Sequence, residues 1–154
     1  MTMTASYVNG YHLGQMLVNG AAYNLDTDTI GVHLYSDSVA SQDKNANEVI
    51  AASATSPYGT VGRVDYTGAT PAGPKTLTNP AVTVAAGVLK FYDAGASTCE
   101  WTGATFTARG AVLYDDTLAG DPVLCAINFG SNKTVTAGTF TITWHADGIF
   151  VATF

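Results

Sequence analysis

Strict alternation of apolar and polar side chains near the C-terminus is the feature that most constrains the fold of this chain. In residues 139–144, three threonines alternate with Phe140, Ile142 and Trp144. A period of two residues places such apolar side chains on one face of a β-strand and the threonines on the other. The segment therefore predicts a half-buried strand whose aromatic and aliphatic face is directed to a core.

Similar signals recur along the chain at spacings of about 8–12 residues, which is typical of antiparallel sandwiches. Residues 29–35 alternate, with Ile30, Val32 and Leu34 on one face and His33 on the other. From residue 75 onward the pattern is almost entirely that of strands. The strands expected there cover residues 75–78, 81–85, 88–93, 97–101, 109–114, 123–129, 139–144 and 149–154.

Turn-forming residues separate these strands. They predict chain reversals at Asp115–Asp121, at Gly130–Asn132 and at Ala146–Gly148. Residues 54–74 hold three of the five prolines and predict a long irregular connection. Long ordered loops are often functional surfaces.

Helical signals are short. In residues 9–20, Leu13, Met16 and Leu17 share one helix face, and Gly20 fits the position that ends a helix. Gly14 weakens this helix by roughly 1 kcal/mol. A second short helix is possible at residues 45–53.

We therefore expect an all-β fold, mainly an antiparallel β-sandwich of jelly-roll or immunoglobulin-like type, with a short N-terminal helix and possibly one more. Residues 1–8 are expected to form an extended N-terminal arm, and residues 9–154 a single domain. The arm carries no charge and too few apolar groups to fold by itself, so a partner is expected to order it.

The charge of the chain excludes several classes of function. Twelve acidic residues stand against six basic ones, giving a net charge of −6. Such a chain is poorly suited to nucleic acid or to anionic membranes, because both need clustered basic side chains. No apolar run approaches the roughly 20 residues of a membrane span. No secretory signal is visible, so synthesis in the cytosol is expected.

Charged residues make up only 12% of the chain, against about 25% in an average soluble domain. Uncharged polar groups are less costly to desolvate than ions, which favours a surface that lies against other proteins. Cys99 and Cys125 are the only cysteines and are expected to be buried free thiols. Alternation places Cys125 on the face of Val123, Ile127 and Phe129.

No catalytic or metal-binding arrangement is apparent. The two glutamates, Glu48 and Glu100, show no sign of meeting as a carboxylate pair. The three histidines lack metal-ligand spacing. Asp26 and Asp28 resemble the start of a calcium loop, but the glutamate that would complete it is missing, so they are interpreted as turn residues. Nucleophile-elbow and phosphate-loop motifs are absent. We therefore expect no enzyme activity, no metal and no cofactor.

Asp115 and Asp116 form a second acidic pair that could also bind a hard cation. The eight tyrosines, six phenylalanines and two tryptophans are enough to build a sugar-binding platform. Most of them fall at inward strand positions, so a role in the core is the better interpretation.

Four segments together resemble a group of small structural proteins of tailed bacteriophages. They are LDTDTIGVHL at 25–34, FTARGAVLYDD at 106–116, PVLCAINFG at 122–130 and GTFTITW at 138–144. In that group a D-x-D-T-I-x-V-x-L strand follows an N-terminal helix, and a G-T-F-T-I-x-W run closes the domain. The similarity covers residues 10–154 in order, loosely over 36–75, and departs from the pattern at Gly31, His33 and Cys125.

The resemblance implies a component of the virion. Within that class, a capsid decoration (cement) protein on the outer shell is favoured, with the major capsid protein and other copies of the chain as partners. The arm suits such a role because an extended segment can add to a neighbour's sheet edge. Met3 and Tyr7 in the arm are therefore candidate partner-binding residues.

Two alternatives stay open. A head- or tail-fibre adhesin would bind host glycans through exposed aromatic residues of the 54–74 connection, Tyr58 and Tyr66, which are the other candidate partner-binding residues. A structural protein of the tail or connector is the second alternative. The sequence does not decide between them.

Overall fold

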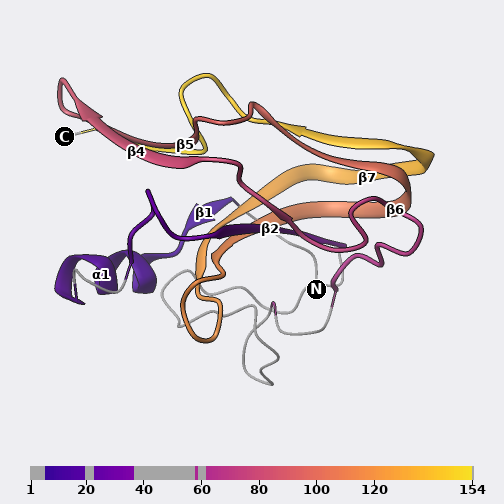
Figure 1. Ribbon diagram of the computed structural model, residues 1–154, viewed down its shortest axis with the longest axis horizontal. Coiled ribbons are helices and arrows are strands. Elements are labelled where there is room, and N and C mark those ends of the chain that lie inside the picture. Colours follow the sequence, from indigo (N-terminus) through magenta and orange to yellow (C-terminus); the bar gives the residue numbers. More distant parts are fainter. Residues whose placement is uncertain (1–5, 20–22, 37–57, 59–61, 154) are drawn as a thin grey trace.

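The computed structural model describes residues 6–19, 23–36, 58 and 62–153. Within these residues the chain forms eight strands and one helix (Figure 1). In chain order they are β1 (Tyr7–Val8), α1 (Gly10–Asn19), β2 (Ile30–Tyr35), β3 (Lys75–Thr76), β4 (Pro80–Ala85), β5 (Val88–Asp93), β6 (Thr98–Asp115), β7 (Val123–Thr143) and β8 (Phe150–Thr153).

All strand pairings are antiparallel, and the strands form two sheets. The larger sheet has the order β1-β7-β6-β2-β3, and the smaller one has the order β4-β5-β8. Figure 1 shows the smaller sheet as a separate layer over the end of the larger sheet that carries β1. The predicted all-β, sandwich-like fold with a short N-terminal helix is therefore confirmed. The possible helix at residues 45–53 lies outside the described residues.

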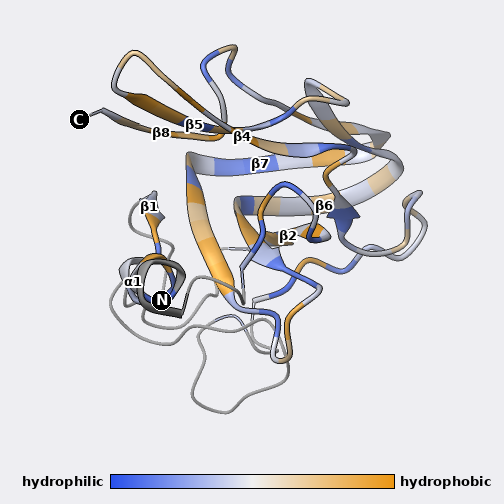
Figure 2. Ribbon diagram, turned by 60° about the vertical axis from the view of Figure 1, so that its left-hand side comes forward, coloured by the Kyte–Doolittle hydropathy of each residue, from blue (hydrophilic) through white to orange (hydrophobic). Residues whose placement is uncertain are grey.

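β6 and β7 form one long ribbon, where four separate strands were expected. β6 joins the segments predicted at 97–101 and 109–114, and β7 joins those predicted at 123–129 and 139–144. The reversal predicted at Gly130–Asn132 is therefore wrong. Because Gly110 pairs with Asn128 and Ala108 with Lys133, residues 129–132 bulge outward opposite a single residue. Such a bulge bends a strand without ending it, and Figure 2 shows β7 turning a corner.

The core lies between the two sheets. Phe140 and Ile142 are both 9% exposed, and the threonines that alternate with them face solvent, as alternation predicts. Trp144 is only half-buried and packs against the edge of the core. The centre holds the fully buried side chains of Ile30, Val32, Leu34, Phe91, Trp101 and Leu113.

Cys125 does not share a face with Val123, contrary to the expectation from alternation. Leu113 pairs with Cys125 but Tyr114 pairs with Val123, so β7 carries an extra residue at Leu124. This bulge reverses the side-chain alternation. Cys125 packs in the main core, whereas Val123 packs in a smaller cluster with Tyr114.

The N-terminal segment differs from the expected free arm. Tyr7 and Val8 form β1, which pairs with Ala126 and Cys125 of β7 in the same chain. Asn9 then begins α1, because its side-chain oxygen accepts a hydrogen bond from the backbone N–H of His12 at 3.1 Å. Residues 6–8 are thus part of the domain, and only residues 1–5 of the predicted arm lie outside the described structure.

Candidate interaction surface

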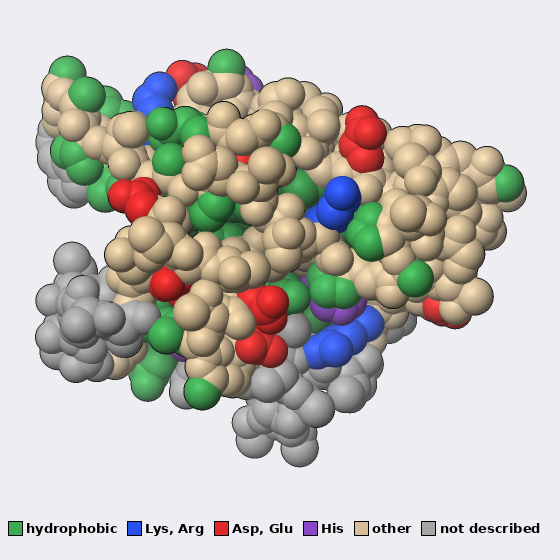
Figure 3. Space-filling view, in the orientation of Figure 1, with side chains coloured by type: hydrophobic (Ala, Val, Ile, Leu, Met, Phe, Trp, Pro, Cys, Tyr) green, Lys and Arg blue, Asp and Glu red, His purple; other side chains and the backbone are tan. Residues whose placement is uncertain are grey.

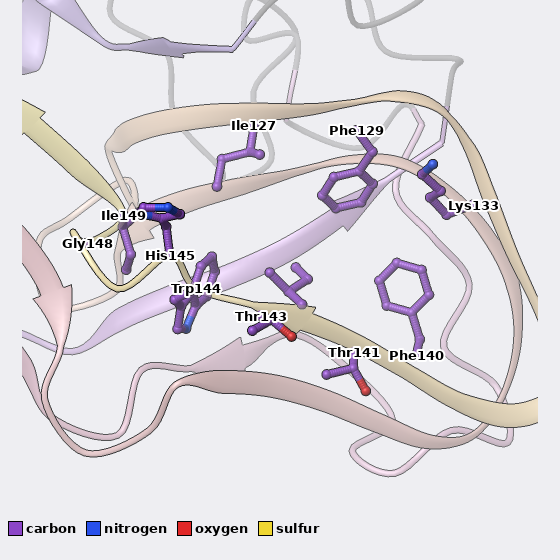
Figure 4. A pocket seen from close by; sticks show the side chains of 11 residues that line it. Ile127, Phe129, Lys133, Phe140, Thr141, Thr143, Trp144, His145, Gly148 and Ile149 are labelled. Carbon is purple, nitrogen blue, oxygen red and sulfur yellow. The ribbon is translucent and has the colours of Figure 1, made fainter.

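An open apolar groove lies along the inner side of β7 (Figure 4). Its volume is about 560 Å³, within the size range of ligand and peptide sites. Its apolar walls are formed by Ile127, Phe129, Phe140, Ile142, Trp144 and Ile149. Few polar groups reach it, so the groove offers apolar area with little charge.

The bend in β7 creates this groove. Ile127 and Phe129 come from the first half of the strand and Phe140 and Ile142 from the second, and the two halves face each other across the bend (Figure 4). The rings of Phe129 and Phe140 have centroids 6.1 Å apart. The turn between β7 and β8 closes one end of the groove with Ile149.

Polar side chains mark the rim of the groove. The Lys133 ammonium donates a hydrogen bond to the Ser131 hydroxyl at 3.0 Å, on the outward bulge of β7. His145 lies 3.4 Å from the Asp147 carboxylate, and both side chains are largely exposed. These groups are too solvated to act as buried acids or bases, but they can contact a polar partner surface.

A second hollow of about 190 Å³ continues the groove toward β1. It shares Ile127 and Ile149 with the first and adds Val8, Cys125 and Phe150. The strands that flank it, β1 and β8, are edge strands, since each has only one neighbour within the described part of the chain. Figure 3 shows the molecule hollowed on this side, below the smaller sheet. Apolar area beside open sheet edges can receive an extended protein segment.

Tyr58 and Tyr66 are not surface residues, which corrects their assignment as partner-binding residues. Tyr58 is 0% exposed and Tyr66 is 7% exposed. The Tyr35 hydroxyl donates a hydrogen bond to the Tyr58 carbonyl at 2.7 Å, and the Tyr66 ring stacks on Trp101 with centroids 6.2 Å apart. Both tyrosines hold the irregular connection onto the sheet.

Of the two candidate partner-binding residues in the arm, the structure describes only Tyr7. Tyr7 is half-buried, and its hydroxyl lies 3.0 Å from the Tyr58 hydroxyl, so it joins the domain to the connection. Met3 lies outside the described residues. Of the three candidate residues that the structure describes, Tyr7 alone lines the smaller hollow, and Tyr58 and Tyr66 line neither hollow.

His33 lies on the face opposite Ile30 and Val32, as predicted, and it is buried there. Its Nδ1 lies 3.1 Å from the Tyr66 hydroxyl and 3.1 Å from the Leu34 carbonyl oxygen. Burial lowers the pKa of His33 to about 4, because the charged imidazolium is poorly solvated there. His33 is therefore a neutral core residue at physiological pH.

The other candidate catalytic and metal-binding residues lie on different elements of the fold. His12 is buried in α1 with Nδ1 2.7 Å from the Tyr23 hydroxyl, and Glu100 is exposed on β6. Asp28 belongs to a turn, as predicted, because its backbone N–H donates to the Asn24 carbonyl at 2.8 Å. In the part of the chain that the structure describes, no three His, Cys, Asp or Glu side chains gather as metal ligands.

No protein-family model matches the chain, and no curated protein or solved structure matches it either. Among the described helices, none has the length and apolar character needed to cross a membrane.

The groove was missed at the sequence level although its residues were identified. Phe140, Ile142 and Trp144 were assigned to a closed core, and Ile127 and Phe129 to the same face of an adjacent strand. The bend in β7 leaves part of this apolar face uncovered. The only local signal was the Gly130–Asn132 run, which marks the corner where the two halves of β7 separate.

Proposed function

We propose that this chain is a structural protein of a tailed-bacteriophage virion, most specifically a capsid decoration protein that binds the outer shell and stabilises it. The proposal includes the major capsid protein and other copies of the chain as partners, and the virion surface as its location. It also holds that the chain is not an enzyme. The four sequence segments that resemble phage structural proteins support this class of function.

The observation that carries the proposal is the apolar groove beside the edge strands β1 and β8. A monomer gains nothing from exposing apolar area beside the edge strands of its sheets, whereas a protein that lies on a shell can cover that area. The surrounding surface is poor in charge, so docking there desolvates few ions. In this proposal the groove receives an extended segment of a shell subunit.

The residues proposed for glycan binding are not accessible to a glycan. It required Tyr58 and Tyr66 to be exposed, and both are buried. A fibre would also be present at far fewer copies than the major capsid protein, so quantitative gel densitometry of virions separates the two functions. A stoichiometry close to that of the major capsid protein supports decoration, and a low one contradicts it.

Binding to capsids that lack this protein tests the groove directly. Ile149→Asp places a carboxylate in the groove, and we expect it to weaken binding more than tenfold because the charge must be desolvated on docking. Val84→Asp is the matched control, because Val84 is 67% exposed on β4, which lies at the other edge of the smaller sheet from β8. We expect the control to bind like the parent.

Thermal unfolding of each variant excludes a loss of fold as the cause. Thr143→Lys serves as a second variant, because Thr143 lines the groove with an exposed side chain and its replacement leaves the core intact. If both groove variants fold and bind with parental affinity, the groove is not the docking surface. If no variant and no parent protein binds the capsid, the decoration function is wrong.

A further inference from the structure

Asp115, the last residue of β6, carries a buried carboxyl group in which only one of the two oxygens accepts hydrogen bonds. Its side chain is 0% exposed. One oxygen, Oδ1, accepts hydrogen bonds from the backbone N–H groups of Thr117 at 2.9 Å and Leu118 at 3.3 Å. The other oxygen, Oδ2, is buried and finds no hydrogen-bond donor among the residues that the structure describes.

Asp28 is the acidic residue whose side chain interacts with the Asp115 carboxyl group. It lies in the turn before β2, and its Oδ2 accepts a hydrogen bond from the Asn24 backbone N–H at 2.6 Å. Ile30 pairs with Asp115 across β2 and β6, which brings the turn beside the end of β6. The Asp28 and Asp115 carboxyl groups lie within hydrogen-bonding reach of each other.

Further contacts hold the two segments together. The Thr29 backbone N–H donates to the Thr117 hydroxyl at 2.8 Å, and the Asp116 backbone N–H donates to the Thr29 carbonyl at 2.8 Å. These bonds therefore keep the backbone of the turn before β2 beside the end of β6.

Within the described part of the chain, no cation is among the groups that act most strongly on Asp115. The Tyr23 hydroxyl, in the segment after α1, is close enough for Asp115 to raise its pKa, and it lies 2.7 Å from Nδ1 of His12. Asp116 is the adjacent residue and is exposed. The groups that act on Asp115 are Asp28 and two backbone N–H donors, with no lysine or arginine among them.

We propose that Asp28 and Asp115 share one proton, which forms a pH-sensitive link between the turn before β2 and the loop that joins β6 to β7. Two carboxylates in contact at a buried site repel each other, whereas a carboxylic acid and a carboxylate form a short, strong hydrogen bond. The unpartnered Oδ2 of Asp115 is the oxygen that this proton serves.

The sign of the pH dependence follows from the direction of the shift. Burial, with the contact from Asp28, raises the pKa of Asp115 from 3.8 to about 6. The folded state therefore binds the proton more tightly than the unfolded state does. The contribution of the pair to stability is complete below about pH 4, declines as the pH rises to about 6 and is constant above that.

The contribution of His33 to stability increases as the pH rises over part of the same pH range. The effect of the Asp28–Asp115 pair is therefore measured as the difference between the parent and a variant that lacks the pair. We compare the thermal unfolding of the full chain with that of Asp28→Asn between about pH 4 and pH 8. The asparagine amide can donate to Oδ2 of Asp115 without a titrating proton. We expect the variant to gain in melting temperature relative to the parent as the pH rises, with the gain levelling off above about pH 6.

Asp116→Asn is the matched control, because it removes an exposed carboxylate from the same loop. Its melting temperature should follow that of the parent at every pH. A difference between parent and Asp28→Asn that does not vary with pH overturns the proposal. So does a calcium-dependent rise in the melting temperature of the parent at neutral pH that Asp28→Asn lacks, because a cation then occupies the place of the proton.

Discussion

The Tyr66 hydroxyl accepts a hydrogen bond from the buried backbone N–H of Leu34 at 2.7 Å. The two residues are 32 positions apart, and this bond attaches the irregular connection to β2, which is buried along its whole length. A residue expected on the surface as a glycan platform thus proves to be a structural anchor.

Tyr66→Phe tests this anchor. The substitution keeps the ring stacked on Trp101 but leaves the Leu34 N–H without its tyrosine acceptor, so we expect a loss of about 1–3 kcal/mol in the free energy of unfolding. Chemical denaturation measures the loss. Tyr92→Phe, on the half-buried face of β5, is the control and should change stability by less than about 0.5 kcal/mol. Equal effects at the two sites would contradict the anchoring role.

Two glycines should respond to alanine in opposite directions. A Cβ at Gly31 would lie within 2.6 Å of the Tyr114 hydroxyl, which stands in a packed cluster, so Gly31→Ala should cost about 1–3 kcal/mol. A Cβ at Gly14 in α1 would meet nothing within 4 Å. Gly14→Ala should therefore stabilise the protein by about 0.5–1 kcal/mol, because alanine loses less backbone entropy in a helix. Chemical denaturation of both variants checks the signs, and a neutral Gly31→Ala would show that Tyr114 can move aside.

The His33 imidazole should titrate far below an ordinary histidine. Burial lowers its pKa from 6.5 to about 4, so the folded state binds the proton less tightly than the unfolded state. Its contribution to stability is complete above about pH 6.5 and is lost as the pH falls through about 4. An NMR titration of the ring signals measures the midpoint directly, and a midpoint above about 6 would be inconsistent with a buried neutral ring.

Both cysteines should react slowly with thiol reagents in the native protein. They are buried and free, and burial raises the pKa of Cys99 to about 11 and that of Cys125 to about 12. Since the thiolate is the reactive form, labelling should require unfolding. Labelling kinetics with and without denaturant test this. Rapid modification of the native protein would show that one of the thiols is accessible.

Deletion of the N-terminal segment should lower the stability of the isolated protein. Removing residues 1–8 takes away β1 and the contact between Tyr7 and Tyr58, so we expect a loss of at least about 1 kcal/mol in the free energy of unfolding. Removing residues 1–5 is the matched control and should cost less. Thermal unfolding of the two truncated proteins decides the matter: equal losses would mean that β1 contributes nothing.

Alternation along the chain was enough to predict most of the strand segments from residue 29 onward. Residues 88–93 were placed at their observed bounds, because an alternating pattern beside polar turns has few other solutions. The Ala146–Gly148 turn was also predictable, since Gly148 adopts a φ of 114° that favours glycine. The buried state of Cys99 and Cys125 followed from their apolar strand neighbours.

The tertiary structure alone decided how the strands join and what they leave uncovered. The Gly130–Asn132 run has the composition of a reversal, but pairing with β6 on both sides carries β7 through it as a bend. Local composition cannot distinguish these outcomes, because both need exposed polar residues and a flexible backbone. The apolar groove exists because that bend makes Phe129 and Phe140 face each other from the two halves of β7.

Long-range partners explain the remaining differences. The Tyr66 hydroxyl is held by the backbone N–H of Leu34, and the Asp115 carboxyl group has a raised pKa because it is buried and lies beside Asp28. In both cases the partner is more than 30 positions away in the sequence. A side chain's neighbours along the chain predict its strand face, but its burial and protonation depend on groups that only the folded chain brings into contact.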